Sequence, residues 1–533
     1  MAGTDAGSGP RNTSRGSAVI LVVVLAAVLM VSMDNSILNV ALKTLAEPPP
    51  AGLGADQSRI QWTIDAYTLA YAGLLLTSGL IGDRIGHKKL LLAGAILFGG
   101  ASAVSAYART PMELIALRAV MGAAGALIMP ATLAIISAEY PGDKRTRALG
   151  IWTAVVGVAV VLGPIIGGAL LGWFWWGSVF LINVPIVLAV VVAVCWFVPD
   201  AARAGGTPVR RMDPVGMGLS VLGLLGLIYG IIRVGEYGDW TRPDAIVPFG
   251  GGLVLLGGFV LWERSVDHPA LNLHHFRERG FAAAATALGV LYFALTGGTL
   301  VIAFYLQGVR GYSALLTGVC VLPLAVSLII FAPRVSKLVR RFGVRAVCVA
   351  GLTAMGVGLL GLATTGTDTP IWLFELYLFV FGTGTAHVHP PATGVLVSAL
   401  PSAESGAASA VNNTFRQVGA SIGAAILGSV LNAAYQARIG SALDGLPPPL
   451  AEPARGSLTA TLRAAADLAE QGRGSQAQSL ARAATEDFVD AMRITWVTAA
   501  AVVLATAVVV AVVMPQAIRA KSRSRPEMNT DQH

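Results

Sequence analysis

The hydrophobic pattern of this chain consists of long apolar runs separated by short polar segments. A bilayer core takes about 20 apolar residues per helix, and only helices or closed barrels satisfy the backbone in lipid. Because no run shows strict two-residue alternation, the pattern predicts an all-α polytopic membrane protein with fourteen transmembrane helices. The predicted spans are residues 17–40, 60–81, 89–108, 111–138, 148–172, 177–198, 214–234, 244–264, 281–306, 314–335, 344–365, 370–397, 405–434 and 491–514.

The composition supports this prediction. Charged residues make up 12% of the 533 residues and hydrophobic residues 55%, whereas a soluble domain carries about 25% charged residues. So few charges exclude an ordinary soluble enzyme. The net charge of +8 fits either a nucleic-acid-binding protein or an asymmetric membrane protein. Cys195, Cys320 and Cys348 lie in apolar runs without metal-ligand spacing, so we expect buried cysteines and no metal site.

The loops decide between these two interpretations of the charge. If the N-terminus is cytoplasmic, 23 of the 37 Lys and Arg residues fall on the inner side and five fall in the short outer loops. This asymmetry follows the positive-inside rule, and an even number of spans returns the C-terminus to the same side. We therefore predict a monomeric, multi-pass protein of the cytoplasmic (inner) cell membrane. Both termini are expected in the cytoplasm, and the charge requires the lipid bilayer but no nucleic acid.

Two parts of the chain resemble each other at a separation of about 257 residues. The turn at 82–88 matches 339–345, and Gly163 and Gly167 match glycines 256 residues further on. Transporters use related halves for alternating access. The predicted organisation is a cytoplasmic tail (1–16), a six-helix half (17–198), a linker with two additional transmembrane helices (199–280), a second six-helix half (281–514) that includes an outer loop (435–490), and a second cytoplasmic tail (515–533).

Ionisable groups inside a membrane span are costly and mark functional sites. Four of those in the predicted spans are candidates for the transport chemistry: Asp34, Asp65, Arg118 and Glu375. The rise of about 1.5 Å per residue puts Asp34 and Arg118 at similar depth in the outer half of the membrane. A carboxylate beside a fixed cation can exchange a proton and respond to a ligand, but a structural ion pair would give the same pattern. Asp65 fits a proton site or an interfacial cap equally, and the repeat makes Glu375 a second candidate proton or cation site.

The turn after the second span is the most specific local motif. Its glycines allow a tight turn, its aspartate can accept amides at a helix N-terminus, and its basic residues can face anionic lipid. Positive-inside charge alone explains the lysines but not the spaced glycines. The predicted cytoplasmic gate motif consists of Gly79, Gly82, Asp83, Arg84, Gly86 and Lys88.

The fifth span is rich in small residues. Small residues let helices approach closely and proline bends a helix, which indicates packing, or a hinge between the halves that also blocks ion leak. The residues concerned are Gly150, Gly163, Pro164, Gly167 and Gly168. Other candidates for lining a cavity are Asn35, Trp152, His387, His389, Asn412 and Arg416.

Aromatic and histidine side chains within the spans need separate interpretation. For single aromatic residues such as Trp152 and Phe180 we expect a lipid-facing position more often than a cavity-lining one. His387 and His389 are two residues apart and face different sides of a helix, which argues against a shared metal. The sequence has no Gly-x-x-x-x-Gly-Lys-Ser/Thr loop, nucleophile–base pair or zinc motif. We therefore expect neither enzyme activity nor a cofactor.

Several segments resemble motifs of the major facilitator superfamily, specifically its fourteen-helix drug:proton antiporters of the quaternary-ammonium and multidrug exporter type. The chain departs from the usual motifs at His87, where Arg is usual, at Met121, where Gln is frequent, and at Ala159, which replaces a glycine. The resembling segments are 34–42 (first-helix signature), 62–67 (exporter-branch motif), 79–89 (inner-loop motif), 118–122 (helix-four motif), 150–168 (antiporter motif) and 180–185 (helix-six motif).

The resemblance implies a major facilitator fold and proton-driven efflux of lipophilic, often cationic, drugs or antibiotics, which would confer resistance. It implies that Asp34 is the leading protonation and substrate residue, that Arg118 is its coupling partner, and that Asp83 belongs to a cytoplasmic gate. The partners would be a small-molecule drug and protons, with the proton-motive force in place of a cofactor. One alternative is a dedicated exporter of an endogenous antibiotic or secondary metabolite, because the Ala- and Gly-rich composition of the chain is typical of a high-GC bacterium. Another is a non-transporting membrane receptor or enzyme.

Overall fold

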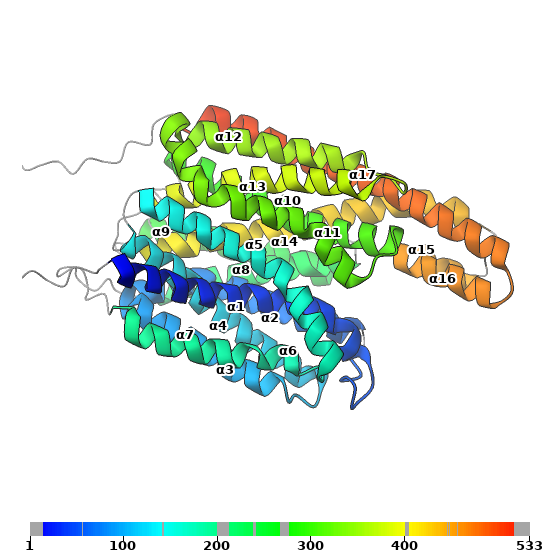
Figure 1. Cartoon of the computed structure of the whole chain (residues 1–533), viewed down its shortest axis with the longest axis horizontal. Coiled ribbons are helices and arrows are strands. Elements are labelled where there is room, and N and C mark those ends of the chain that lie inside the picture. The colour runs from blue at the N-terminus through cyan, green and yellow to red at the C-terminus, as the bar shows by residue number, and fades with distance from the viewer. Residues whose placement is uncertain are drawn as a thin grey trace, which may run out of the picture.

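The computed structural model describes residues 14–55, 57–140, 143–199, 213–237, 241–266, 277–399, 405–444, 446, 448–455 and 457–515. Within these ranges every regular element is a helix. The long helices form one elongated bundle (Figure 1). The predicted tails fall almost wholly outside the described residues, as does part of the predicted linker.

The N-terminal part of the bundle contains α1 (Ser14–Ala46), α2 (Gln57–Ile85), α3 (His87–Ser105), α4 (Pro111–Glu139), α5 (Asp143–Trp173), the short α6 (Ser178–Leu181) and α7 (Asn183–Phe197). The next two helices are α8 (Pro214–Tyr237) and α9 (Pro243–Ser265). The C-terminal part contains α10 (Arg279–Ala303), η2 (Phe304–Val309), α11 (Ala314–Phe331), η3 (Ala332–Arg334), α12 (Val335–Ala363), α13 (Ile371–Ala399), α14 (Ser405–Ile439), η5 (Gly440–Leu443), α15 (Pro448–Arg455), α16 (Leu458–Glu470) and α17 (Gly474–Val513).

The helices confirm a multi-pass membrane architecture. Among the described residues, 12 helical segments are long and apolar enough to cross a membrane. One of them, Leu316–Ala363, joins the predicted tenth and eleventh spans and bends at Gly343, where φ is 82°. The predicted fifth span contributes only a shorter apolar helix, Arg147–Ala159. The number of fourteen spans stays a prediction.

Local sequence explains where several helices begin. At the start of α4, the side chain of Thr110 accepts a hydrogen bond from the backbone N–H of Glu113 at 3.2 Å, and Pro111 occupies the first turn. The Glu113 carboxylate in turn accepts from the backbone N–H of Arg109 at 2.8 Å. Reciprocal bonds of this kind satisfy backbone donors that a helix start leaves unpaired. Ser313 caps α11 in the same way through its side chain.

The start of α1 and the end of α17 lie at the same end of the bundle. In Figure 1, α1 begins and α17 ends on the left, whereas α15, α16 and the start of α17 project on the right. We call these the terminal end and the hairpin end. The segment predicted as an outer loop (435–490) contains the helices α15 and α16, and α17 runs without interruption from Gly474 into the last span. These helices therefore extend the bundle lengthwise (Figure 1).

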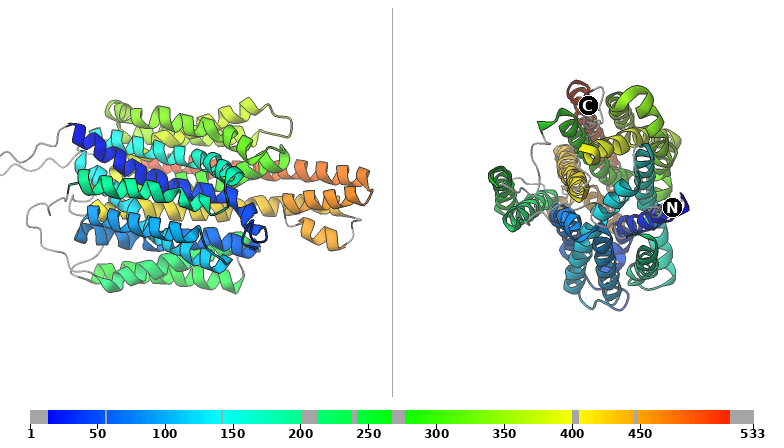
Figure 2. Two further views of the ribbon diagram at one scale, coloured as in Figure 1. Left: turned by 60° about the horizontal axis from the view of Figure 1, so that its bottom comes forward. Right: turned by 90° about the vertical axis from the view of Figure 1, so that its left-hand side faces the viewer.

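Buried hydrophobic residues form two large clusters. One contains only residues between Ile20 and Val198, and the other is built mainly from residues between Phe281 and Met514. The helices α8 and α9 pack against each other, and α8 also contacts α2 and α14. The second view in Figure 2 shows this pair at the periphery of the bundle. We refer to the two clusters as the N-terminal and C-terminal halves, while the predicted domain boundaries stay predictions.

The two halves use glycine in equivalent positions. Gly167 of α5 packs against Ile37 of α1, and Gly423 of α14 packs against the backbone of Phe293 in α10. The members of both pairs differ by 256 positions, as the sequence repeat predicts. In both halves a missing side chain lets two helices approach closely, so the repeat is a repeat of helix packing.

A second equivalence concerns the turns at the terminal end. Gly86, between α2 and α3, has φ 97°, and Gly343, at the bend within α12, has φ 82°. Side-chain-bearing residues rarely adopt such angles. The two glycines are 257 positions apart, which extends the match of the halves to their backbone conformation.

Candidate functional site

Arg118 of α4 lies fully buried inside the N-terminal half, where it pairs with Asp34 of α1. Its Nη1 donates to Asp34 Oδ2 at 2.5 Å, its Nε donates to the backbone carbonyl of Thr63 at 3.2 Å, and its Nη2 donates to Asn35 Oδ1 at 3.4 Å. The guanidinium also lies 4.3 Å from the ring centroid of Tyr67. The cation on α4 is therefore held by side chains and a carbonyl of two other helices, α1 and α2.

The second oxygen of the Asp34 carboxylate is held by an asparagine. Asn183 Nδ2 donates to Asp34 Oδ1 at 2.9 Å and to Ser102 Oγ at 3.1 Å. The Ser102 hydroxyl donates to the carbonyl of Phe180 at 2.8 Å. Neither Asn183 nor Ser102 is predicted from the sequence, although an asparagine at the start of an apolar helix is a signal that could have identified the first. Each oxygen of the Asp34 carboxylate therefore accepts a hydrogen bond, one from Arg118 and one from Asn183.

This arrangement ties the charge of Asp34 to the packing of four helices. Removing one partner of a buried ion pair leaves an uncompensated charge, which costs about 3–5 kcal/mol. Asp34 is 2% exposed and Arg118 0%. Protonation of the carboxylate would therefore change the balance of forces on α1, α4 and α7 (which carries Asn183). A proton-dependent conformational change needs such a coupling.

The structure places the other two predicted charges elsewhere. Asp65 is buried on α2, two residues after Thr63. Glu375 lies on α13 in the C-terminal half and is partly exposed. No hydrogen bond or ion pair among the described residues joins Glu375 to the Arg118 cluster. The roles predicted for both residues stay predictions.

A second cluster of side chains joins the two halves. Nδ1 of His389 on α13 lies 2.6 Å from the hydroxyl of Thr153 on α5. The His389 ring stacks on Trp152 with 6.0 Å between centroids and 12° between planes, and it meets the edge of Tyr292 at 5.7 Å. The guanidinium of Arg416 on α14 lies 5.0 Å from the Trp152 ring and 4.6 Å from the Tyr292 ring. The cluster thus links α5 of the N-terminal half to α10, α13 and α14.

Two expectations about environment are wrong. Trp152 and Phe180 are 0% and 1% exposed, so neither faces lipid. Trp152 is covered by the opposite half, and Phe180 packs within its own. Cys195, expected to be buried, is exposed on α7, while Cys320 and Cys348 are buried.

His387 and Asn412 lie within the C-terminal half. His387 Nδ1 lies 2.7 Å from the carbonyl of Thr383, and its ring is 5.7 Å from that of Phe331. Asn412 is fully buried and accepts a hydrogen bond from the Thr393 hydroxyl at 3.0 Å. His387 and His389 thus have different surroundings. Within the described residues no group of three or more His, Cys, Asp or Glu side chains could hold a metal ion.

A small cavity lies between the Asp34–Arg118 pair and the cluster around His389 and Arg416. Its volume is about 140 Å³, below the range of about 300–1,000 Å³ that drug-sized ligands occupy. The halves must therefore separate before such a ligand can enter. The lining comes from both halves and includes two predicted cavity residues, Asn35 and Arg416. The lining residues are Val31, Ser32, Asn35, Tyr67, Thr68, Tyr71, Met129, Arg416 and Gln417.

The glycines of α5 divide between two contacts. A Cβ on Gly150 would meet the carbonyl of Ala332 in the C-terminal half, whereas a Cβ on Gly163 would meet Ser36 of α1. Gly168 has open space around it. The side chain of Pro164 lies outside the described residues. The α5 helix therefore packs on its own half near the hairpin end and on the opposite half near the terminal end.

The predicted gate motif lies at the terminal end. Asp83 Oδ1 pairs with His87 Nε2 at 3.2 Å, one helical turn away, and Lys88 Nζ donates to the carbonyl of Cys195 at 3.3 Å. A Cβ on Gly82 would come within 2.7 Å of the His87 ring. Gly79 is buried and Arg84 is exposed. The histidine that replaces the usual arginine therefore occupies the space that Gly82 leaves and contacts the motif's aspartate.

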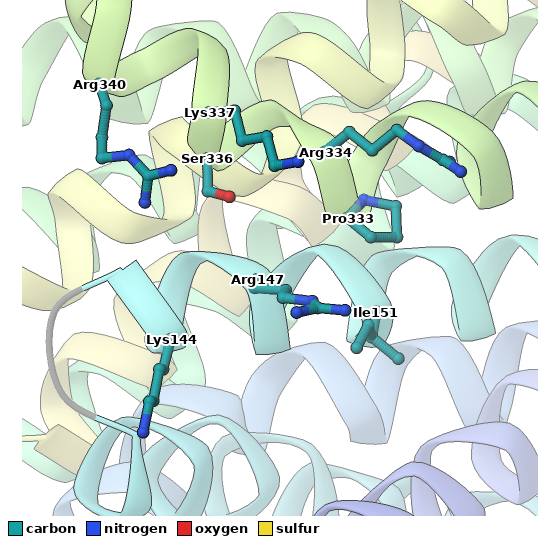
Figure 3. Close-up of a pocket in the computed structure, with 8 residues that line it drawn as sticks. All are labelled: Lys144, Arg147, Ile151, Pro333, Arg334, Ser336, Lys337 and Arg340. Carbon is teal, nitrogen blue, oxygen red and sulfur yellow. The ribbon is translucent and has the colours of Figure 1, made fainter.

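A groove lined by basic residues lies beside this motif. It has a volume of about 600 Å³ and separates the start of α5 from η3 and the start of α12. Figure 3 shows its cationic side chains arriving from both halves. They are Lys144, Arg147, Arg334, Lys337 and Arg340.

These features define a class of protein: a polytopic helical bundle of two related halves, with a buried ion pair inside one half and a cavity between the two halves. Residues 24–424 match the family Major Facilitator Superfamily. The chain belongs to this family.

Individual relatives are resistance and export proteins. The chain is 34% identical to the methyl viologen resistance protein SmvA of Salmonella typhimurium, over 79% of this chain and 83% of that protein. It is 31% identical to the tetracenomycin C resistance and export protein of Streptomyces glaucescens, over 92% and 90%. It is 32% identical to the multidrug efflux pump LfrA of Mycolicibacterium smegmatis, over 93% and 95%. The fold is similar to that of the human organic anion transporter MFSD10, with a TM-score of 0.61, 12% identity and coverage of 93% of this chain and 99% of that one.

Proposed function

We propose that the protein exports lipophilic drugs or antibiotics across the cytoplasmic membrane in exchange for protons and thereby confers resistance. The observation that carries this proposal is the buried Asp34–Arg118 pair, which lies beside a cavity between two related halves. The resistance and export functions named for its relatives support the same conclusion. On this proposal the protein is a transporter and not an enzyme, and the proton-motive force takes the place of a cofactor.

The ion pair supplies the proposed coupling step. A proton that binds Asp34 removes the negative charge to which Arg118 is bound. Arg118 then keeps only neutral partners, among them Thr63 and Asn35, and an unpaired buried cation favours rearrangement. Because Asn35 and Tyr67 both contact Arg118 and line the cavity, this rearrangement reaches the substrate space directly.

Contacts between the halves support alternating access. Gly150 and Gly157 of α5 approach Ala332 and Leu328 of the opposite half, and Thr153 lies between them on the same helix. These contacts hold the halves together toward the terminal end. In the proposed cycle they separate and reform while substrate moves through the space between the halves.

We propose that the terminal end faces the cytoplasm. The basic groove lies at this end, and cytoplasmic loops carry the excess of Lys and Arg in membrane proteins. Its cations come from both halves, so they repel one another across the groove. The proposed location is the cytoplasmic membrane of a bacterium.

The second candidate is a dedicated exporter of one antibiotic made by the same cell. The similarity to a tetracenomycin C resistance and export protein favours this version. A resistance panel in an efflux-deficient bacterial host distinguishes the two, because a dedicated exporter protects against one chemical scaffold only. Repeating the panel with a proton uncoupler tests the energy source. Unchanged resistance in the presence of the uncoupler would contradict proton drive, and no resistance to any compound would contradict export.

A further inference from the structure

The charge of the central cavity points to the kind of substrate that it accepts. Of the nine residues that line it, only Arg416 carries a formal charge at neutral pH. The neighbouring Asp34 and Arg118 neutralise each other at 2.5 Å. The cavity of this conformation is therefore positively charged, whereas the resemblance to multidrug exporters implies substrates that are often cationic.

Arg416 has no acidic partner within the part of the chain that the structure describes. Its Nη1 donates to Asn413 Oδ1 at 3.0 Å, three residues away on the same helix. Its Nε is buried and has no hydrogen-bond partner. The residue lies 11 positions after the start of α14, which is about 17 Å along the helix. An uncompensated guanidinium at such depth in a membrane is costly and marks a functional site.

Packing alone explains only part of this arrangement. The ring faces of Trp152 and Tyr292 stabilise the guanidinium through its flat surface. Even with these rings and Asn413 beside it, the buried Nε–H of Arg416 remains without a hydrogen-bond partner. Arg416 also borders the cavity itself, together with Tyr71 and Gln417. Its environment therefore combines aromatic surfaces with an unused, buried hydrogen-bond donor.

The two rings belong to different halves, which makes the site sensitive to conformation. Trp152 is on α5, whereas Tyr292 and Arg416 are on α10 and α14. When the halves separate, Arg416 loses the ring of Trp152 but keeps Tyr292 and Asn413. The guanidinium then becomes more accessible at the same time as the cavity widens.

We propose that Arg416 binds an acidic group on an aromatic substrate, such as a carboxylate, a phenolate or an acidic enol. A guanidinium forms two parallel charge-assisted hydrogen bonds with a carboxylate, and Tyr292 offers a ring face beside it for the aromatic part of the molecule. This assignment rests on the proposed export function and names its substrate class: planar aromatic compounds with a negative charge.

Two xanthene dyes test the proposal because they share a scaffold and differ in charge. Fluorescein is anionic at pH 7.5, and rhodamine 123 is cationic. Binding of each dye to the purified full-length protein in detergent is measured by fluorescence anisotropy, and export is measured in energised cells. The variants are Arg416→Gln, Arg416→Lys and, as a matched control on the same helix, Arg438→Gln, whose side chain donates to its own helix at Ala434.

We expect the wild type to bind fluorescein, and Arg416→Gln to bind it about 10–100-fold more weakly, because a hydrogen bond to a charged group is lost. Arg416→Lys should keep part of the affinity, and Arg438→Gln should match the wild type. Rhodamine 123 binding should be unchanged or stronger in Arg416→Gln, which also shows that this variant is folded.

Three results would overturn the assignment of Arg416: no fluorescein binding by the wild type, equal fluorescein binding by the wild type and Arg416→Gln, or an equal loss of both dyes in that variant. Failure of the export function has a different signature. In that case the wild-type protein binds fluorescein in an Arg416-dependent manner, but cells export neither dye nor any compound of the resistance panel. This result would contradict export and still support the binding site at Arg416.

Discussion

The Asp34 carboxylate and the Arg118 guanidinium lie 2.5 Å apart inside the N-terminal half, although the residues are separated by 84 positions. Both side chains are almost fully enclosed, and neutral groups on α1, α2 and α7 complete the hydrogen bonds of the pair. A single proton on Asp34 would therefore act on several helices at once.

Asp34→Asn is expected to abolish efflux while the protein still reaches the membrane. The change preserves the shape of the side chain but removes the exchangeable proton. It also leaves Arg118 unpaired, which should destabilise the protein by about 3–5 kcal/mol. Efflux of a resistance substrate and the midpoint of thermal unfolding in detergent are the two measurements.

Asp490→Asn is the matched control, because Asp490 pairs with Arg493 at 3.2 Å while both side chains are about half exposed. Exposed pairs contribute about 0–1 kcal/mol, so stability and efflux should stay near wild type. The double variant Asp34→Asn, Arg118→Met should regain stability without regaining efflux. Normal efflux by Asp34→Asn alone would eliminate the proposed role of Asp34.

Gly163→Ala and Gly168→Ala are expected to differ although they lie on the same helix. A Cβ at Gly163 would meet Ser36 and come within 2.9 Å of the Ile37 backbone nitrogen, whereas a Cβ at Gly168 would meet nothing within 4 Å. Overpacking costs about 1–3 kcal/mol, so Gly163→Ala should unfold at lower temperature and transport more slowly. Gly168→Ala should behave as wild type or be slightly more stable. Equal effects would contradict the α1–α5 contact.

Gly150→Leu is expected to separate the halves at the terminal end, since a side chain there would meet the Ala332 carbonyl. The readout is maleimide labelling of Ser336→Cys, a residue 8% exposed within the basic groove, in a background without native cysteines. Labelling should become faster than in the parent protein. Gly172→Leu, on the same helix with no atom within 4 Å, is the control, and equally slow labelling in both would reject this contact as a closure point.

Gly86→Ala is expected to destabilise the turn between α2 and α3 through the backbone alone. The residue has φ 97° and ψ 137°, and a Cβ would meet no atom within 4 Å. Forcing such angles on a residue with a side chain costs about 1–3 kcal/mol. Gly100→Ala, within α3 and equally unobstructed, should lose no stability. Thermal unfolding of the two variants compares them, and identical midpoints would show that the turn can relax.

The sequence predicts much of the architecture because the bilayer imposes a length and a polarity on each span. The length of each hydrophobic run predicts where the chain is helical. The position of Asp34 and Arg118 along their spans predicts that both lie at a similar depth in the membrane. The repeated glycines predict equivalent packing in the two halves, which Gly167 and Gly423 show. These properties are local or periodic, so a linear pattern records them.

Other parts of the site depend on which helices become neighbours. Asn183 on α7 binds the Asp34 carboxylate, and Ser102 on α3 accepts a hydrogen bond from Asn183. Nothing in the spacing of these residues indicates that they meet. The expected lipid position of Trp152 is wrong for the same reason. Its helix is apolar enough for lipid, but the opposite half covers that face.

The sequence by itself determined a multi-pass helical protein of two related halves with charged residues inside its spans, because hydrophobic length and periodic small residues act along the chain. Only the tertiary structure decided which charges are neutralised. Arg118 finds Asp34 within its own half, whereas Arg416 meets aromatic rings and an amide but no carboxylate among the described residues. The cavity keeps the positive charge of Arg416 because Arg118 is neutralised and Arg416 is not. Which arginine is neutralised depends on the packing of helices that are distant in sequence.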